Sequence, residues 1–181
     1  TCLENRLHVM LEKPMVLTAK HARSLVELSS QYHRELIIGY PWLFTTHAKR
    51  ARDVVNSGEL GQIRYINCVF ASTCIQFYRG EDSTYKKTFN YPVIGPGDVY
   101  SDPERSGGGQ GHLQVTHSAG LMHFISGLKP VSVMALMNNL DVNVDVVDAM
   151  VVRMDNGALA TVGSTGSLRP EDPDALTIQL Y

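Results

Sequence analysis

Residues 7–39 constrain the fold more than any other stretch of the sequence. Residues 7–11 are mostly apolar without regular alternation, which is typical of a strand buried on both faces. Thr18 is a suitable helix N-cap, and residues 19–33 carry apolar side chains at helical spacing. Residues 35–39 form a second predicted strand of the same kind. Strand, helix and strand together predict a βαβ unit with parallel strands.

The rest of the chain has the pattern of a sheet crossed by one helix. Apolar spacing and turn residues predict, in order, a helix over 44–56, a long strand over 62–72, a loop over 73–106, a helix over 109–126, and strands over 131–138, 145–154 and 158–165. Asp155-Asn156-Gly157 separates the last two runs and is a strong hairpin signal. The closing LTIQLY is a further strand. The pattern favours a largely antiparallel sheet.

This change of pattern divides the chain into two expected domains. We place residues 1–60 in a parallel α/β domain and residues 61–181 in a second domain built on the sheet. No cap or polar tail follows the last strand, and the first residues resemble the middle of a domain. We therefore expect the chain to be a fragment that enters the first domain late and leaves the second domain incomplete.

Composition and charge exclude several classes of protein. The chain has 181 residues, 44% of them hydrophobic, and a formal net charge of −2, so it offers no basic footprint for nucleic acid or an anionic membrane. Its longest apolar runs are far shorter than the roughly 20 residues of a membrane-spanning helix. Three cysteines without a CxxC pair and seven dispersed histidines predict neither disulfides nor a metal site. A cytoplasmic location is the default expectation.

Lys13 is the first candidate for chemistry. It follows the first predicted strand, and ligands of open α/β sheets bind at the carboxyl ends of the strands. A lysine there can act as a general base, a proton donor or a point charge for an anion. A surface lysine at a turn is the alternative.

The segment SGGGQGHLQVTH, residues 106–117, is the second candidate. Its three glycines allow a close approach of the backbone and could cradle a phosphate, although the pattern is not GxGxxG. Gln110, Gln114 and His117 recur at helical spacing, which predicts that they share one face of an otherwise apolar helix. Such a polar stripe lines a cleft or joins a satisfied buried network. Both alternatives stay open.

Four blocks of sequence carry a resemblance to a known family. HVMLEKPMVLT, IIGYPWLF, VVNSGELGQIRYIN and GGGQGHLQVTHSAGLMHFISGLKPVSVMA occur in this order, and from residue 7 to at least 165 the chain is similar to the Gfo/Idh/MocA family of nicotinamide-dependent oxidoreductases. The resemblance implies an α/β (α+β) fold. The tail of a Rossmann domain is followed by a mixed, largely antiparallel open sheet with a helix packed on it. Such a sheet is the glyceraldehyde-3-phosphate dehydrogenase-like or dihydrodipicolinate reductase-like C-terminal domain.

The same resemblance implies a nicotinamide site. Lys13 would hydrogen-bond the reacting hydroxyl and help to move its proton, and Glu12 and Pro14 would shape the cofactor side, with a cis bond before Pro14. Tyr100 falls where relatives carry an aromatic residue close to the nicotinamide. The cofactor would be NAD or NADP. Its site is expected to be incomplete here, since the glycine-rich turn of the Rossmann domain is not in the sequence, so we expect the chain alone to bind dinucleotide weakly or not at all.

On the substrate side, the resemblance matches His117 to the family histidine that contacts the substrate hydroxyl. Gln114 would lie beside it, and Trp42, after the second strand, is a further substrate contact or simply part of the core. Many relatives carry an aspartate four residues before the histidine, where this chain has Leu113. A leucine can neither orient an imidazole nor carry a proton.

Three functions follow as alternatives. The first is an oxidoreductase that acts on a sugar, a cyclitol or a related polyhydroxy compound. The second, suggested by Leu113, is a non-catalytic subunit that binds a sugar or nucleotide as a sensor or in assembly. The third is an oligomerisation module. The strands after residue 130 carry apolar residues at both odd and even positions, and one helix cannot cover both faces, so a homo-oligomer through the open sheet face is expected.

Overall fold

The structure is a computed structural model that describes residues 1–81, 83 and 97–181. The chain forms two compact units, Thr1–Pro41 and Trp42–Tyr181. Its elements follow one another as β1 Val9–Glu12, α1 Ala19–Tyr32, β2 Leu36–Gly39, the 3-10 helix η1 Pro41–Phe44, α2 Thr46–Ser57, β3 Tyr65–Ala71, α3 Ile75–Tyr78, the 3-10 helix η2 Val99–Ser101, α5 Pro103–Ser106, α6 Gln110–Leu113, α7 Val115–Ser126, β4 Pro130–Asn138, β5 Val147–Met154, β6 Leu159–Thr165 and β7 Ala175–Leu180.

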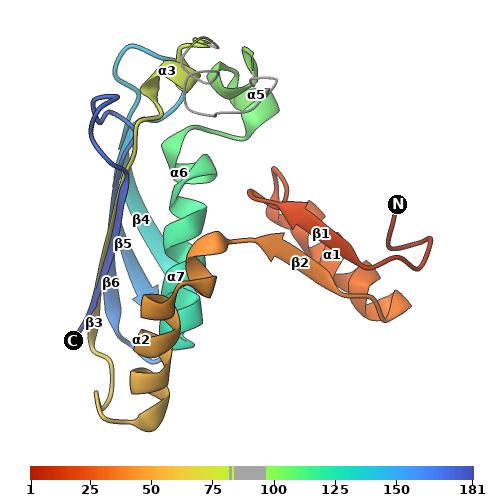
Figure 1. The fold of residues 1–181 in the computed structure, drawn as a ribbon, viewed down its shortest axis with the longest axis vertical. Helices are drawn as coiled ribbons and strands as arrows, with labels where there is room; N and C mark the ends of the chain where they lie inside the picture. Colours follow the sequence, from red (N-terminus) through yellow and green to blue (C-terminus); the bar gives the residue numbers. More distant parts are fainter. Residues whose placement is uncertain (82, 84–96) are drawn as a thin grey trace. The chain divides into compact units, whose positions relative to one another are not determined.

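The first unit is the predicted βαβ unit. β1 and β2 are parallel, with Glu12 opposite Gly39, so both strands end at the same edge. α1 connects them, and its N-cap is Thr18, whose hydroxyl accepts a hydrogen bond from the His21 amide at 3.3 Å. Two parallel strands joined by a helix are therefore confirmed (Figure 1).

The burial of these strands differs from the prediction. Met10 of β1 is 77% exposed and Ile37 of β2 is 50% exposed. No residue of α1 is fully buried either. Two short strands and one helix offer too little surface to cover both faces of a sheet. The expectation of strands buried on both faces is therefore wrong within this unit, because apolar composition does not say what covers a strand.

The second unit is built on one five-stranded sheet with the order β4-β5-β6-β3-β7. β3 and β6 are parallel, and every other pair of neighbours is antiparallel. Figure 1 shows α2, α6 and α7 on the same side of this sheet. The predicted mixed, largely antiparallel open sheet with a helix packed on it is confirmed.

The core lies between the sheet and these helices. Ile66 and Cys68 of β3 and Val162 of β6 are almost completely buried, and they cluster with Val115 and Met122 of α7. Because side chains alternate along a strand, their neighbours point to the other face. That outer face carries exposed apolar side chains: Tyr65, Val69, Met134, Leu136, Val147, Val151 and Leu159.

The predicted hairpin between β5 and β6 is confirmed. The Met154 amide donates to the Ala158 carbonyl at 2.8 Å, and Gly157 has a φ of +87°, which glycine adopts without steric cost. The Asn156 amide group also donates to the carbonyl of Ile63 at 3.1 Å. The turn is thereby tied to the segment that leads into β3.

α2 belongs to the second unit, not to the first. Ala48 of α2 is buried and clusters with Leu121 and Ile125 of α7. The compact units therefore divide between residues 41 and 42, whereas the domain boundary was predicted near residue 60. Helical periodicity reveals an apolar face but not the partner on which that face packs. The assignment of residues 1–60 to a Rossmann domain stays a prediction.

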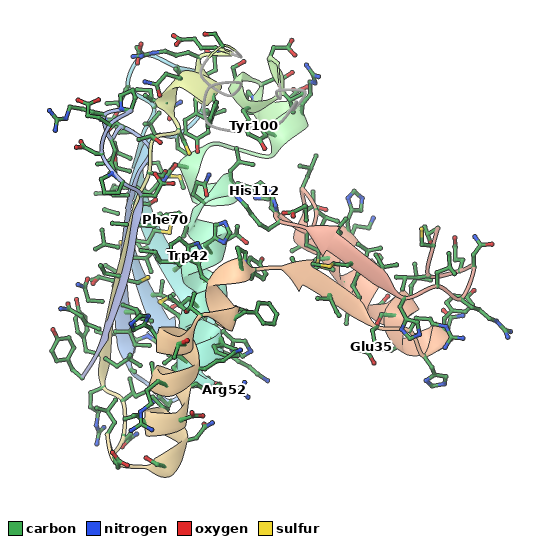
Figure 2. All side chains as sticks on the ribbon, in the orientation of Figure 1. Glu35, Trp42, Arg52, Phe70, Tyr100 and His112 are labelled. Atoms are coloured by element: carbon green, nitrogen blue, oxygen red, sulfur yellow. The ribbon has the colours of Figure 1, made fainter. Side chains whose placement is uncertain are left out.

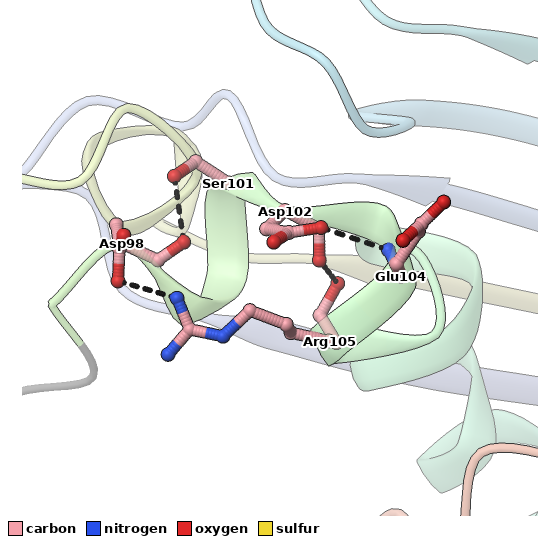
Figure 3. Close-up of polar contacts among 6 residues, drawn as sticks. Asp98, Ser101, Asp102, Glu104 and Arg105 are labelled. Carbon is pink, nitrogen blue, oxygen red and sulfur yellow. Dashed lines mark hydrogen bonds and ion pairs between the residues drawn. The ribbon is translucent and has the colours of Figure 1, made fainter.

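The predicted loop over 73–106 contains three short helices, α3, η2 and α5, in its described part. Figure 3 shows the polar contacts before the glycines: Arg105 donates to Asp98 Oδ1 at 2.7 Å, and Asp102 Oδ1 accepts from the Glu104 amide at the start of α5. The hydrogen bond from Arg105 lowers the pKa of Asp98. Residues 82 and 84–96 of this predicted loop lie outside the described residues.

The triple glycine lets the backbone pack directly against Asp145, in the connection between β4 and β5. The Gly109 and Gly111 amides donate to the two carboxylate oxygens of Asp145, and the Gln110 amide donates to its backbone carbonyl at 2.8 Å. A Cβ built on Gly109 would overlap that carbonyl oxygen and lie 2.9 Å from the Asp145 nitrogen. The contact therefore requires glycine at position 109.

We predict that Gly109→Ala destabilises the protein far more than Gly163→Ala. The new methyl group would collide with the Asp145 backbone, whereas a methyl group at Gly163 would come no closer than 3.8 Å to a Val69 side-chain carbon. Overpacking typically costs about 1–3 kcal/mol. Urea denaturation of both variants measures the free energy of unfolding. Equal losses in the two variants would contradict the close contact at Gly109.

Candidate active site

The first group of candidate residues lies at the carboxyl end of β1. Glu12 ends the strand and is exposed, and the half-buried Lys13 follows it. The Glu12 carboxylate lies beside β2, since a Cβ built on Gly39 would be 3.5 Å from each of its oxygens. The bond between Lys13 and Pro14 is cis, as expected. An amine and a carboxylate thus lie at the end of a parallel strand, where open sheets bind ligands.

His117 lies in the first turn of α7 and is 6% exposed. Its ring stands edge-on to the Phe70 ring of β3, with 5.8 Å between the ring centroids. Phe70 is in turn edge-on to Trp42 at 6.4 Å, and Figure 2 shows these two residues together. Edge-on packing is a favourable arrangement of aromatic rings. The row of rings from η1, β3 and α7 restricts the orientation of the imidazole.

The helix predicted over 109–126 is interrupted at Gln114. α6 ends there and α7 begins there, with a φ of −117° at Gln114. The Gln114 side-chain amide donates to the sulfur of Cys74 at 3.2 Å. Gln110 thus belongs to α6, Gln114 to the junction and His117 to α7. Their side chains contact Ser72, Cys74 and Phe70, respectively.

Gln110 belongs to a buried hydrogen-bond network. It is 0% exposed, its side-chain nitrogen donates to Ser164 Oγ at 2.8 Å, and its oxygen accepts from the Tyr78 hydroxyl at 2.9 Å. Burial raises the pKa of Tyr78 strongly, so that its hydroxyl keeps the proton it donates. Of the two alternatives left open by the sequence, the satisfied network holds for Gln110.

Leu113 is a core residue. It is 4% exposed and shares an apolar cluster with Cys74, Ile75, Tyr78, Val144 and Val146. Tyr100, labelled in Figure 2, packs against the same cluster and is half-buried. The position that many relatives are expected to fill with an aspartate is therefore apolar here, and Leu113 supplies no carboxylate to His117.

Trp42 lines a cavity of about 330 Å³ within the second unit. This volume falls in the range of small-molecule sites. The other walls come from α2, α7, β7 and the turn before α2: Thr45, His47, Ala48, Ala51, Leu121, Ile125, Leu176 and Ile178. His117 and Gln114 are not among them. A contact between Trp42 and a substrate stays a prediction.

The glycine turn does not cradle a phosphate. A phosphate would need free backbone amides at the turn, but the amides of Gly109, Gln110 and Gly111 already donate to Asp145. The protein thus supplies its own anion at this position. These three amides are therefore not available to bind a phosphate.

Two absences hold for residues 1–81, 83 and 97–181. Within these ranges, no group of three or more histidine, cysteine, aspartate or glutamate side chains is arranged to hold a metal ion. Within the same ranges, no helix combines the length and apolar character needed to cross a membrane.

Sequence reasoning did not single out Phe70, Asp145 or Asp148. Alternation along β3 places Phe70 on the core face, which is a signal that could have identified it. The contact between Asp145 and Gly109 joins residues 36 positions apart. Nothing in the local sequence of either segment announces such a contact.

Comparison with known proteins identifies a sugar reductase and a catabolism protein as relatives. The dTDP-3,4-didehydro-2,6-dideoxy-alpha-D-glucose 3-reductase of Saccharopolyspora spinosa is 25% identical over 165 residues, which are 89% of this chain and 43% of that protein. The rhizopine catabolism protein MocA of Rhizobium meliloti is 34% identical over 62 residues, which are 34% of this chain and 20% of that protein. The chain thus spans less than half the length of the curated relatives it matches.

A solved structure supports the fold. The structure of an inositol dehydrogenase homolog from Azotobacter vinelandii, complexed with NAD+, matches 99% of this chain and 44% of its own chain with a TM-score of 0.81. At 20% sequence identity this likeness shows the fold alone. The family model of the Gfo/Idh/MocA C-terminal domain matches residues 48–180. Because that match covers most of the sequence, the chain belongs to the Gfo/Idh/MocA family.

Proposed function

We propose that this protein is an oxidoreductase that transfers a hydride between NAD or NADP and a CH–OH group of a sugar, a cyclitol or a related polyhydroxy compound. Family membership supports the reaction class. A curated relative named as a sugar reductase and a similar structure of an inositol dehydrogenase homolog with NAD+ support the substrate class and the cofactor. The observation that carries the proposal is the half-buried Lys13 at the carboxyl end of a parallel strand.

The chemistry divides between the cofactor and the chain. A bound nicotinamide would supply the hydride acceptor. The Lys13 amine would accept the proton of the substrate hydroxyl, and in the reverse direction its ammonium group would return that proton. Glu12, Pro14 and Tyr100 would border the cofactor. A lysine can fill this role since its pKa is easily shifted by its surroundings.

His117 would position the substrate rather than carry its proton. Leu113 gives it no carboxylate, and its ring orientation is restrained by Phe70. An imidazole held in this way can still hydrogen-bond a substrate hydroxyl, with Gln114 beside it. The proposal thus gives Lys13 the proton transfer and His117 the orientation of the hydroxyl group.

A non-catalytic subunit that binds a sugar or nucleotide is the second candidate. The apolar environment of Leu113 favours it, because the usual carboxylate of the catalytic pair is replaced by a core side chain. Assays of nucleotide reduction with a panel of polyols separate the two candidates. Turnover on any of them supports the enzyme, whereas binding of a polyol without turnover supports the sensor.

We predict that Lys13→Met in the intact protein lowers turnover by about 10²–10⁴-fold, the usual effect of removing a general acid or base. Dinucleotide affinity, measured by NADH fluorescence, should stay nearly unchanged, because methionine keeps the aliphatic part of the side chain. Lys20→Met, at an exposed position of α1, is the matched control and should keep full turnover. Near-normal turnover of Lys13→Met would refute the assigned role.

We predict a different pattern for His117→Ala. Loss of a group that only positions the hydroxyl should raise KM and cost less in kcat than the Lys13 substitution. His117→Gln keeps a hydrogen-bonding group and should recover part of the affinity. His21→Ala, at an exposed site of α1, controls for the loss of an imidazole. A fall in kcat as large as that of Lys13→Met would make His117 a proton carrier instead.

We also propose that a second copy of the chain covers the outer face of the sheet. Seven large apolar or aromatic side chains on this face are at least 37% exposed, and Leu136 reaches 79%. Contiguous exposed apolar surface marks an interaction site. No helix of the described residues lies on this face (Figure 1). Strands from two copies can stack their outer faces because both faces carry the same apolar pattern.

We predict that the intact protein is an oligomer at micromolar concentration and that Val69→Lys with Val151→Lys shifts it towards the monomer. Both side chains lie on the outer face and are 40% and 51% exposed, so two charges there would oppose stacking. Leu60→Lys, which is 40% exposed outside the sheet, is the control. Light scattering that shows a monomer for the unmodified protein would contradict the proposed interface.

A further inference from the structure

Asp148 is a buried carboxyl group on the core face of β5. It is 3% exposed and lies opposite Ser164 of β6 and Met137 of β4. Among the described residues, neither of its carboxyl oxygens has a hydrogen-bond partner. An ionised carboxylate in such a place would pay a large desolvation penalty. A proton on Asp148 removes that penalty and turns the group into a donor.

Asp145 is a second carboxyl group close to Asp148. Both carboxyl groups approach Gly111, since a Cβ built there would lie 3.2 Å from Asp145 Oδ2 and 3.5 Å from Asp148 Oδ2. Asp145 itself is held by the amides of Gly109 and Gly111. Asp145 thus accepts two backbone amides, whereas Asp148 has no such donor.

The other titratable groups near the pair carry no positive charge at neutral pH. Burial lowers the pKa of His112 on α6, so its imidazole is neutral, and its Nε2 is buried without a hydrogen-bond partner among the described residues. Burial raises the pKa of Tyr78 on α3, which also stays neutral. Cys74, before α3, is a buried thiol. Within the described part of the chain, a proton is therefore the natural counter-charge for two neighbouring carboxylates.

We propose that Asp145 and Asp148 share one proton and that this proton fastens the glycine turn and α6 to the sheet. Asp148 is anchored in β5, and Asp145 holds the amides of residues 109 and 111. A hydrogen bond from the Asp148 carboxylic acid to the Asp145 carboxylate links these two anchors. Since α7 follows α6 directly, the shared proton also holds the start of the helix that carries His117.

The pKa of Asp148 agrees with this arrangement. Burial, and then the charge of Asp145, raise it to about 7. The folded state therefore binds this proton more tightly than the unfolded chain does. Its stabilising effect is complete below the carboxyl pKa of the unfolded chain, near 4, and is lost as the pH rises through about 7. Above that value two charges face each other and the turn loosens.

The decisive experiment uses the intact, unmodified protein. At about pH 6, below the raised pKa, infrared difference spectroscopy should show the carbonyl band of a buried protonated carboxylic acid, and this band should disappear as the pH rises to about 8. Asp148→Asn should abolish the band, and Asp53→Asn, at an exposed position of α2, should keep it. If the unmodified protein shows no titrating protonated carboxyl group, the proposal is refuted, even when a variant fails to fold.

Unfolding experiments test whether the shared proton holds the glycine turn and α6 to the sheet. The melting temperature of the unmodified protein and of Asp53→Asn should fall between about pH 6 and 8, since the protonated fraction drops about tenfold for each pH unit above the pKa. Asp148→Asn should lose much of this fall, because its amide donates to Asp145 at every pH. Amide hydrogen exchange at residues 109–111, corrected for its intrinsic pH dependence, should accelerate only in the first two proteins. An unchanged pH dependence in Asp148→Asn would overturn the proposal.

Discussion

The contact between Asp145 and the glycine turn determines where α7, the helix that carries His117, begins. Three successive backbone amides donate hydrogen bonds to Asp145, and two of them donate to its carboxylate. Hydrogen bonds to a charged acceptor are among the stronger ones in proteins. They fix α6 against β5 and β6, so α7 must start from a defined point. The burial of His117 against Phe70 depends on that start.

Features set by neighbouring residues could be predicted from the sequence. The cap of α1 at Thr18 and the hairpin at Gly157 rest on contacts a few residues apart, and both have the expected form. The burial of the first unit's strands differs from expectation because it depends on surfaces distant in the sequence, and the packing of α2 on α7 depends on such surfaces too. The break at Gln114 also depends on distant contacts. The start of α6 is hydrogen-bonded to Asp145, whereas α7 packs on the core.

The candidate site shows the same limit. The sequence placed Lys13 after a parallel strand and His117 on a largely apolar helix, and the structure has both. It could not tell whether Gln110 lined a cleft, because a satisfied network and a polar cleft need the same residue types. The partners of Gln110 come from β6 and α3. Only the packed chain reveals that its donors and acceptor are already used.

The positions of the carboxyl groups near α6 bear on the proposed chemistry. An aspartate at position 113 would lie among Val144, Val146 and other apolar side chains, where ionisation is costly. The chain has a leucine there. Of the two aspartates near the glycine turn, Asp148 is buried in β5 and Asp145 accepts the turn's amides, so neither stands at the family's usual place. In the proposed function, proton transfer at the substrate hydroxyl is therefore assigned to Lys13, and His117 is assigned to orient that hydroxyl.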